Sequence, residues 1–182
     1  MSNLSTGEAS RGDASRMLEI YRPYVTDTTI TFEYEVPSLK EFTSRIEKIQ
    51  KRYPYLVCEK EGRIIGYAYG DTYMLRPAYD WCAEVSIYVD REERGKGAGR
   101  KLYEALFEEL RRMHVLNLYA VITSENEKSL EFHGKLGFET FAVFEKAGYK
   151  HGKWLDVTWM QKFLGEHKDC PERVVWAEER NL

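Results

Sequence analysis

The densest group of residues suited to chemistry is a basic, glycine-rich loop at residues 94–101. Its cations are Arg94, Lys96, Arg100 and Lys101, and Gly95, Gly97, Ala98 and Gly99 lie between them. Glycines let a backbone approach a phosphate closely, and a helix that starts here adds roughly half a positive charge. The pattern predicts a site for a phosphate-bearing ligand, and the alternative is a solvated turn. It is not a Walker A loop, because Leu102 follows Lys101.

A carboxylate, Glu84, lies on the polar side of the clearest strand pattern. In residues 83–90, apolar Ala83, Val85, Ile87 and Val89 alternate with Glu84, Ser86, Tyr88 and Asp90. If Glu84 borders a half-buried cleft, desolvation raises its pKa toward neutrality and makes it a suitable general base. The alternative is a carboxylate on the sheet surface, in contact with water.

Asn126 and His133 form a second candidate pair. They are seven residues apart, which places them on nearly the same helix face, about 10 Å apart. One can bind a polar group of a cofactor while the other faces the reaction. The alternative for His133 is a structural or surface histidine.

Metal and nucleophile chemistry fit the sequence poorly. The histidines His114, His133, His151 and His167 are widely separated and show no zinc-ligand spacing. No GxSxG nucleophile motif is present. Cys82 shares a strand face with Glu84, but a small buried residue explains it better than a thiol nucleophile. We therefore expect no metal.

The composition favours one cytoplasmic domain. The 182 residues are 43% apolar, which suffices for a single packed core. Lys and Arg total 27 against 30 Asp and Glu, a net charge of −3 that argues against general nucleic-acid or anionic-membrane binding. No apolar stretch approaches the ~18 residues of a membrane span, and no secretory signal is recognised. Three cysteines without a CxxC pair fit a reducing cytoplasm.

Periodicity and turn signals predict the elements that position these residues. Residues 1–10 are interpreted as a frayed end or a weak first strand, and 165–182 as an unassigned tail. Asp13 can cap a helix ending near Pro23, and Ser38 with Glu41 opens another that reaches about Arg52. Further helices are expected at about 98–114 and from Asn126 to Gly137. Strands are expected at 55–59, 64–70, 83–90, 115–122, 138–144 and 155–160, with a turn at 148–152.

The order of these motifs resembles the GNAT superfamily of acetyl-CoA-dependent N-acetyltransferases. The resemblance is carried by the strand, by the R-x-x-G-x-G loop (Arg94, Gly97, Gly99), and by N-x-x-S-x-x-x-H-x-x-x-G-F over residues 126–138. Residues 20–24, 31–35, 76–84 and 148–157 are also similar to the phosphinothricin and methionine sulfoximine acetyltransferase branch. The resemblance spans 17–162 and implies an α+β (three-layer α/β) GNAT fold in one domain over 1–182. It implies a mixed sheet of about six to seven strands flanked by about four helices.

The resemblance also implies a cofactor and a mechanism. The cosubstrate would be acetyl-CoA, with its pyrophosphate on residues 94–101 and its pantetheine arm along the backbone of Ile87, Tyr88 and Val89. Asn126 and Ser129 would bind near the thiol end. Glu84 matches the general base that frees the amine for direct attack on the thioester, and His133 stands where a general acid protonates the leaving thiolate.

For the acceptor, the resemblance implies a small-molecule amine, namely a small amino acid or toxic analogue such as phosphinothricin, methionine sulfoximine or methionine sulfone. Arg76 would pair with a carboxylate or phosphinate, and the candidate pocket walls are Phe32, Tyr34, Tyr79, Lys150 and His151. For the aromatic residues among them, core packing is the alternative. A homodimer is also implied. The alternatives are a protein N-terminus or a polyamine as acceptor, or a non-catalytic acetyl-CoA-binding interaction protein.

Overall fold

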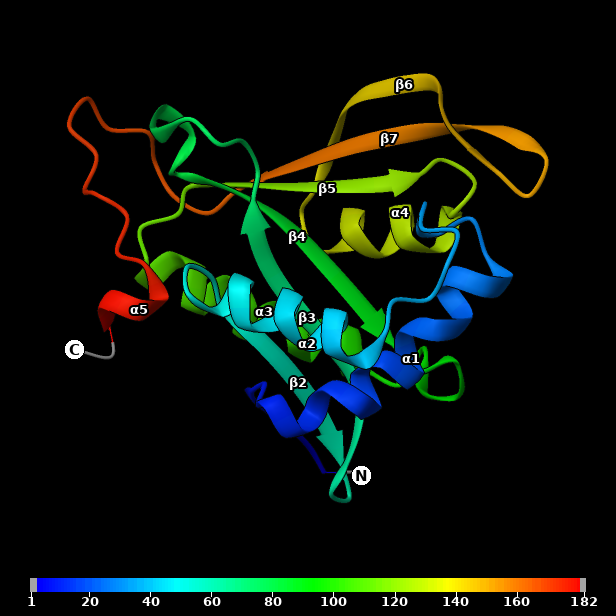
Figure 1. Ribbon diagram of the computed structural model, residues 1–182. Coiled ribbons are helices and arrows are strands. Elements are labelled where there is room, and N and C mark those ends of the chain that lie inside the picture. Colours follow the sequence, from blue (N-terminus) through cyan, green and yellow to red (C-terminus); the bar gives the residue numbers. More distant parts are fainter. Residues whose placement is uncertain (1–2, 181–182) are drawn as a thin grey trace.

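One seven-stranded sheet with helices on both faces forms the body of the molecule. The computed structural model describes residues 3–180, and the strand order is β1-β2-β3-β4-β5-β7-β6 (Figure 1). The strands are β1 (Leu4–Glu8), β2 (Tyr55–Lys60), β3 (Arg63–Thr72), β4 (Cys82–Val89), β5 (Asn117–Thr123), β6 (Glu139–Lys150) and β7 (Lys153–Phe163). The helices are α1 (Ala14–Asp27), α2 (Leu39–Gln50), α3 (Ala98–Arg112), α4 (Glu127–Lys135) and the short α5 (Ala177–Arg180). The predicted mixed sheet in an α+β fold is confirmed.

Two apolar cores lie on opposite faces of the sheet. Along β2, Leu56 and Cys58 pack into the core beneath α3, whereas Tyr55 and Val57 pack into the core beneath α1 and α2. Successive side chains of a strand point to opposite faces, so both faces of β2 are covered. This explains why the strand is apolar without alternation.

The contact between β4 and β5 is the feature that creates space for a site. These two strands pair in parallel only over Cys82–Glu84 and Asn117–Tyr119, and then they diverge (Figure 1). The Asp90 N–H donates to Ile65 O on the β3 side at 2.8 Å. Since backbone groups alternate along a strand, the amide groups of Ile87 and Val89 point the other way, into the opening.

The first helix is longer than its sequence predicts. It passes through Pro23 and ends at Asp27, so the prediction that it ends near Pro23 is wrong. A proline inside a helix costs about 3 kcal/mol. The next turn nevertheless buries Tyr24 and Val25, and Arg91 donates to the Pro23 carbonyl at 2.8 Å. Tertiary contacts therefore outweigh the local preference.

The β6–β7 hairpin also differs from expectation. The predicted turn at 148–152 is reduced to His151-Gly152, because Gly148 and Lys150 continue β6 and pair with Leu155 and Lys153. His151 and Gly152 have φ values of 50° and 78°, as a two-residue hairpin turn of type I′ requires. Cross-strand pairing thus extends almost to the tip.

Both chain ends contain ordered structure. Residues Leu4–Glu8 form β1 and pair antiparallel with β2, as the strand alternative for 1–10 predicts, while Met1 and Ser2 lie outside the described residues. In the tail, Trp176 packs on Tyr53 and lies 3.9 Å from the Arg52 guanidinium; residues 181–182 are outside the description. Within residues 3–180, no helix has the length and apolar character needed to cross a membrane.

Candidate active site

A cavity of about 480 Å³ lies where the glycine-rich loop meets β4 and α4. The predicted residues that line it are Ile87, Val89, Arg94, Gly95, Gly97, Gly99, Arg100, Asn126 and Ser129. Gly95 and Gly97 have φ values of 75° and 94°, a left-handed backbone that glycine adopts without strain. Gly97 is also the N-cap of α3. A helix N-terminus and a bare backbone therefore meet at one wall of the cavity.

The four predicted cations separate into two pairs. Arg94 and Arg100 line the cavity, and the Arg94 guanidinium lies 4.9 Å from the ring centre of Tyr24. Lys96 instead lies 3.5 Å from Glu93, and Lys101 donates to the Leu4 carbonyl of β1. Lys96 and Lys101 are not among the lining residues, and Ala98 is buried.

Sequence reasoning missed a second group of cavity residues, on α4. Lys128, Phe132, Lys135 and Leu136 line the cavity opposite the loop. Their spacing places them on one helix face. The helical spacing could therefore have indicated them, but the prediction considered only Asn126 and His133 on this helix. Asn126 has a structural task too: its Oδ1 accepts the Ser129 N–H at 3.3 Å and caps α4.

A smaller cavity of about 60 Å³ occupies the opening between β4 and β5. It is lined by residues 85–88 and 120–123, by Ile30 and Tyr103, and by Asn126, Ser129 and His133. Four of these residues, Ile30, Ile87, Asn126 and Ser129, also line the larger cavity. The two cavities therefore share a wall.

Glu84 lies at the last paired position before β4 and β5 separate. It is opposite Tyr119 of β5 and Asp71 of β3. Partial burial raises the pKa of Glu84, and the charge of Asp71 raises it further. Burial also raises the pKa of Asp71, whose Oδ1 accepts the Thr72 N–H at 2.7 Å. Sequence reasoning missed Asp71 because only the β3–β4 register brings the two carboxyls together.

His133 is 3% exposed and both of its ring nitrogens have partners. Nδ1 lies 2.8 Å from the Ser129 carbonyl, which can only accept, so Nδ1 carries the hydrogen. Burial lowers the pKa of His133 to about 4, which leaves Nε2 without a proton at neutral pH. The Tyr103 hydroxyl, 3.0 Å away, then donates to Nε2. Tyr103 was not predicted, because it lies on another helix.

Four predicted acceptor residues lie near the tip of the β6–β7 hairpin. Phe32 and Tyr34 come from the segment between α1 and α2, and the Tyr34 hydroxyl donates to the Tyr149 carbonyl. His151 lines a cavity of about 370 Å³ that also includes Ile30 and Asn126. Lys150 is buried, and its ammonium binds backbone carbonyls inside the protein.

The other two acceptor residues, Arg76 and Tyr79, lie in the β3–β4 connection. Arg76 is exposed, and its guanidinium makes no hydrogen bond or ion pair with residues 3–180. Tyr79 has its ring centre 6.0 Å from that of Tyr73, and Tyr73 stacks on Tyr119 at 4.2 Å. Tyr119 is opposite Glu84. The three stacked or adjoining rings of Tyr79, Tyr73 and Tyr119 therefore extend from the β3–β4 connection toward Glu84, the carboxyl whose pKa is raised.

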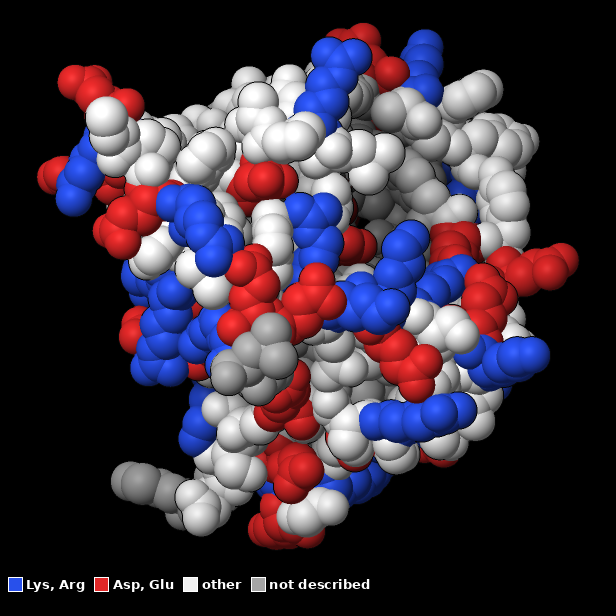
Figure 2. Space-filling view, turned by 60° about the vertical axis from the view of Figure 1, so that its left-hand side comes forward, with Lys and Arg blue, Asp and Glu red and all other residues white. Residues whose placement is uncertain are grey.

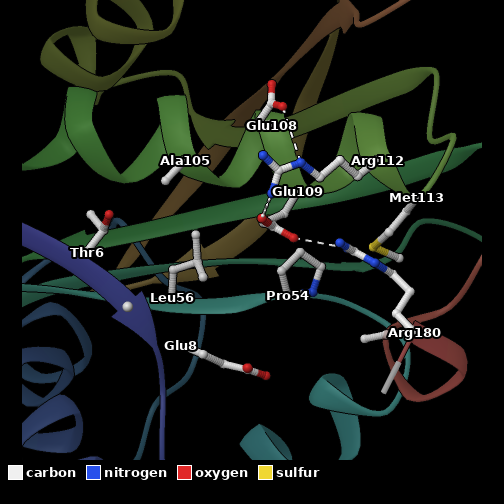
Figure 3. A pocket seen from close by; sticks show the side chains of 12 residues that line it. Thr6, Glu8, Pro54, Leu56, Ala105, Glu108, Glu109, Arg112, Met113 and Arg180 are labelled. Carbon is white, nitrogen blue, oxygen red and sulfur yellow. Dashed lines mark hydrogen bonds and ion pairs between the residues drawn. The ribbon is translucent and has the colours of Figure 1, made fainter. Parts of the chain in front are cut away.

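Another cavity of about 480 Å³ lies between β1, β2, α3 and α5, and it contains none of the predicted residues. Figure 3 shows its ion pairs: Glu109 contacts Arg112 at 2.8 Å and Arg180 at 3.0 Å. The bare glycine backbone and the α3 N-terminus line the other cavity instead, so we place the site at the glycine-rich loop. The described residues, 3–180, hold no cluster of three or more His, Cys, Asp or Glu suited to a metal.

Comparisons with known proteins agree on one family. Residues 8–159 match the family described as "Acetyltransferase (GNAT) domain". A phosphinothricin N-acetyltransferase of Streptomyces viridochromogenes is 34% identical over 154 residues, 85% of this chain and 84% of that protein. An L-methionine sulfoximine/L-methionine sulfone acetyltransferase of Salmonella typhimurium is 34% identical over 160 residues, 87% and 94% of the two chains.

A solved structure extends the agreement to three dimensions. It is a GNAT superfamily phosphinothricin acetyltransferase from Sinorhizobium meliloti in complex with acetyl-CoA. Its TM-score is 0.91 at 35% identity, with 98% of this chain and 97% of that chain covered. The glycine-rich loop, the divergent strands and these matches together establish that the chain belongs to the GNAT family of acetyltransferases.

Proposed function

We propose that this protein transfers the acetyl group of acetyl-CoA to the α-amino group of a small amino acid or a toxic analogue such as phosphinothricin, methionine sulfoximine or methionine sulfone. The names of the relatives support the reaction and the acceptor class. The observation that carries the proposal is Glu84, a half-buried carboxyl with a raised pKa beside the opening between β4 and β5.

The residues around the larger cavity fit acetyl-CoA. The backbone at Gly95–Gly99 with Arg94 and Arg100 suits a diphosphate, because bare amides, a helix N-terminus and guanidinium groups meet there. The amide groups of Ile87 and Val89 point into the opening and suit the pantetheine arm. The Tyr24 hydroxyl accepts the Val89 N–H at 3.1 Å and donates to the Val89 carbonyl, so a pantetheine arm would displace this hydroxyl at Val89. When bound, the cosubstrate supplies a thioester as the acetyl donor.

Glu84 acts as the general base in this proposal. It takes one proton from the acceptor ammonium, and the free amine attacks the thioester carbonyl directly. The new C–N bond forms, the C–S bond breaks, and the second amine proton is lost as the sulfur gains one. His133 remains the proposed acid beside the thiolate. Because its Nε2 lacks a proton and burial raises the pKa of the neighbouring Tyr103 hydroxyl, His133 in this proposal first takes the second amine proton and then gives it to the sulfur.

Thiol release from acetyl-CoA tests the proposal. The acceptor panel contains phosphinothricin, methionine sulfoximine, methionine sulfone, common amino acids, polyamines and a peptide. We expect activity with phosphinothricin, methionine sulfoximine, methionine sulfone or a common amino acid. Activity confined to polyamines or the peptide favours the alternative acceptors, and silence with acetyl-CoA still bound favours a non-catalytic acetyl-CoA-binding protein.

Glu84→Gln tests the mechanism. We expect kcat to fall by a factor of about 10² to 10⁴ while the acetyl-CoA Kd stays within about twofold. Glu139→Gln, an exposed change on β6, is the control and should leave both values unchanged. Equal activity of the Glu84 and Glu139 variants would remove Glu84 from the mechanism.

We propose further that the protein is a cytoplasmic homodimer. The unpaired cysteines Cys58, Cys82 and Cys170 fit a reducing compartment. The edge strand β6 exposes Phe141, Val143 and Phe144, and Trp154 is exposed beside it on β7. A long apolar sheet edge is suited to pairing with a second copy.

A further inference from the structure

The segment Thr28–Tyr34, here called the entry segment, has no helix or strand of its own but is fixed at several points. The Thr123 hydroxyl at the end of β5 donates to the Thr29 carbonyl at 2.6 Å. The Tyr34 hydroxyl donates to the Tyr149 carbonyl of β6. The tip of the β6–β7 hairpin and this segment therefore lie side by side, as Figure 1 shows.

Lys150 makes the most buried of these contacts. Its side chain is 2% exposed, and its ammonium donates to the carbonyls of Val25 at 2.8 Å and Thr31 at 2.7 Å. It forms no ion pair within residues 3–180. Val25 lies in the last turn of α1, where helix carbonyls lack partners and the dipole favours a cation. Because burying an ammonium is costly, these two carbonyls must stay in place for the fold to tolerate it.

Gly148 contacts the same segment two residues earlier on β6. A Cβ added there would lie 2.5 Å from Cζ and 2.8 Å from Cδ2 of Phe32. Gly148 does not have the left-handed φ of the turn glycines, so the backbone does not require glycine. The present position of the Phe32 ring leaves no room for a Cβ at Gly148. Residues two apart face the same side of a strand, so Gly148 and Lys150 act on neighbouring residues, Phe32 and Thr31.

The entry segment borders the site. Its Ile30 lines the larger cavity, the opening between β4 and β5, and the cavity that holds His151. Phe32, two residues on, is 40% exposed although its ring is packed on Gly148. An acceptor amine that approaches the opening from this side passes along Ile30 and Phe32.

We propose that Gly148 and Lys150 are positioning residues for the acceptor, which together fix the entry segment against β6 and so set the width of the acceptor's path. This inference rests on the proposed acetyl transfer. Lys150 was expected from sequence to contact the substrate itself. Its role is instead to hold Thr31 and the end of α1, while the absent side chain at Gly148 leaves room for Phe32.

Steady-state kinetics of Lys150→Met and Gly148→Ala test this with the best acceptor of the panel. We expect the acceptor KM to rise about tenfold or more, because a displaced wall misplaces the amine. The acetyl-CoA Kd should stay within about twofold of the unmodified protein, since the loop at 94–101 is untouched. Lys150→Arg, which keeps the donors, should give an intermediate KM.

The controls are matched in chemistry. Lys146→Met removes an exposed lysine of β6 that makes no ion pair within residues 3–180. Gly134→Ala adds a methyl group where nothing lies within 4 Å. Both should retain the acceptor KM. If Lys150→Met and Gly148→Ala match these controls, or if their acetyl-CoA affinity falls in parallel with the acceptor KM, the inference is overturned.

Hydrogen exchange separates this inference from the proposed function. The amides of Ile30 and Glu33, which donate to the Thr28 and Thr31 hydroxyls, should exchange faster in Lys150→Met and Gly148→Ala but not in the controls, whether or not an acceptor has been found. Lost protection without any acceptor activity in the unmodified protein would count against the proposed function alone. Unchanged protection would overturn the positioning role even in an active enzyme.

Discussion

Burial shifts the pKa values of Glu84 and His133 in opposite directions, because it disfavours whichever form carries a charge. Glu84 keeps its proton to higher pH, and His133 loses its proton at lower pH. Spacing alone placed Asn126 and His133 on one helix face, and both do line the same opening. The partner of His133 on α3, Tyr103, and the carboxyl beside Glu84, Asp71, depend on packing and register that no local pattern contains.

The depressed pKa of His133 predicts a loss of stability in mild acid. Its folded pKa of about 4 lies below the ordinary histidine pKa of 6.5, so protonation favours the unfolded chain as pH falls from 6.5 toward 4. Between pH 7 and pH 5 the cost is about 2 kcal/mol. Urea unfolding at both pH values should show that His133→Gln loses this part of the pH dependence. His167→Gln, at an exposed position, should retain it, and an identical slope in both variants would contradict the assignment.

At the scale of elements, local signals succeeded where one segment decides its own shape. Alternation located β4, helical spacing located α3, and Ser38 caps α2 by accepting the Glu41 N–H at 3.2 Å. They failed where distant contacts decide. Pro23 lies within α1 because the next turn is buried. Lys150 turns inward because the α1 terminus offers it carbonyls, and neither contact is visible in a sequence window.

The turn from β4 into α3 predicts a sensitive position at Gly97. Its φ of 94° is strained for a β-branched residue, so valine there would distort a backbone that lines the cavity. Gly97→Val should therefore weaken acetyl-CoA binding by about 100-fold or more, as measured by calorimetry. Gly7→Val in β1, where nothing lies within 4 Å, is the control for adding valine. Unchanged affinity in the Gly97 variant would exclude the loop as the diphosphate site.

For the whole molecule, the charge of −3 is an average over different surfaces. Figure 2 shows Lys and Arg side chains mixed with Asp and Glu over the visible face. The cavity is lined by the cations Arg94, Arg100, Lys128 and Lys135 and by one acid, Glu93, while Arg100 and Lys135 also pair with Glu104 and Glu131. The location of this local excess was partly predicted. The contribution of Lys128 and Lys135 could not be predicted, because only the tertiary fold brings α4 to the glycine-rich loop.

The exposed edge of β6 predicts the oligomeric state. The unmodified protein should run as a dimer in light scattering at micromolar concentration, and Val143→Lys should shift it toward monomer because it places a charge on the apolar edge. Leu39→Lys, at an exposed apolar residue of α2, should remain a dimer. A monomeric unmodified protein would refute the homodimer.

The short parallel contact between β4 and β5 also bears on which acyl chains the enzyme accepts. Beyond Glu84 and Tyr119 no ladder joins the two strands, so widening the opening there breaks no sheet hydrogen bond. The side chains that line the opening include Val85 and Ile122, and these would limit an acyl chain longer than acetyl. Donor length is therefore a property of replaceable side chains and can change without rebuilding the sheet.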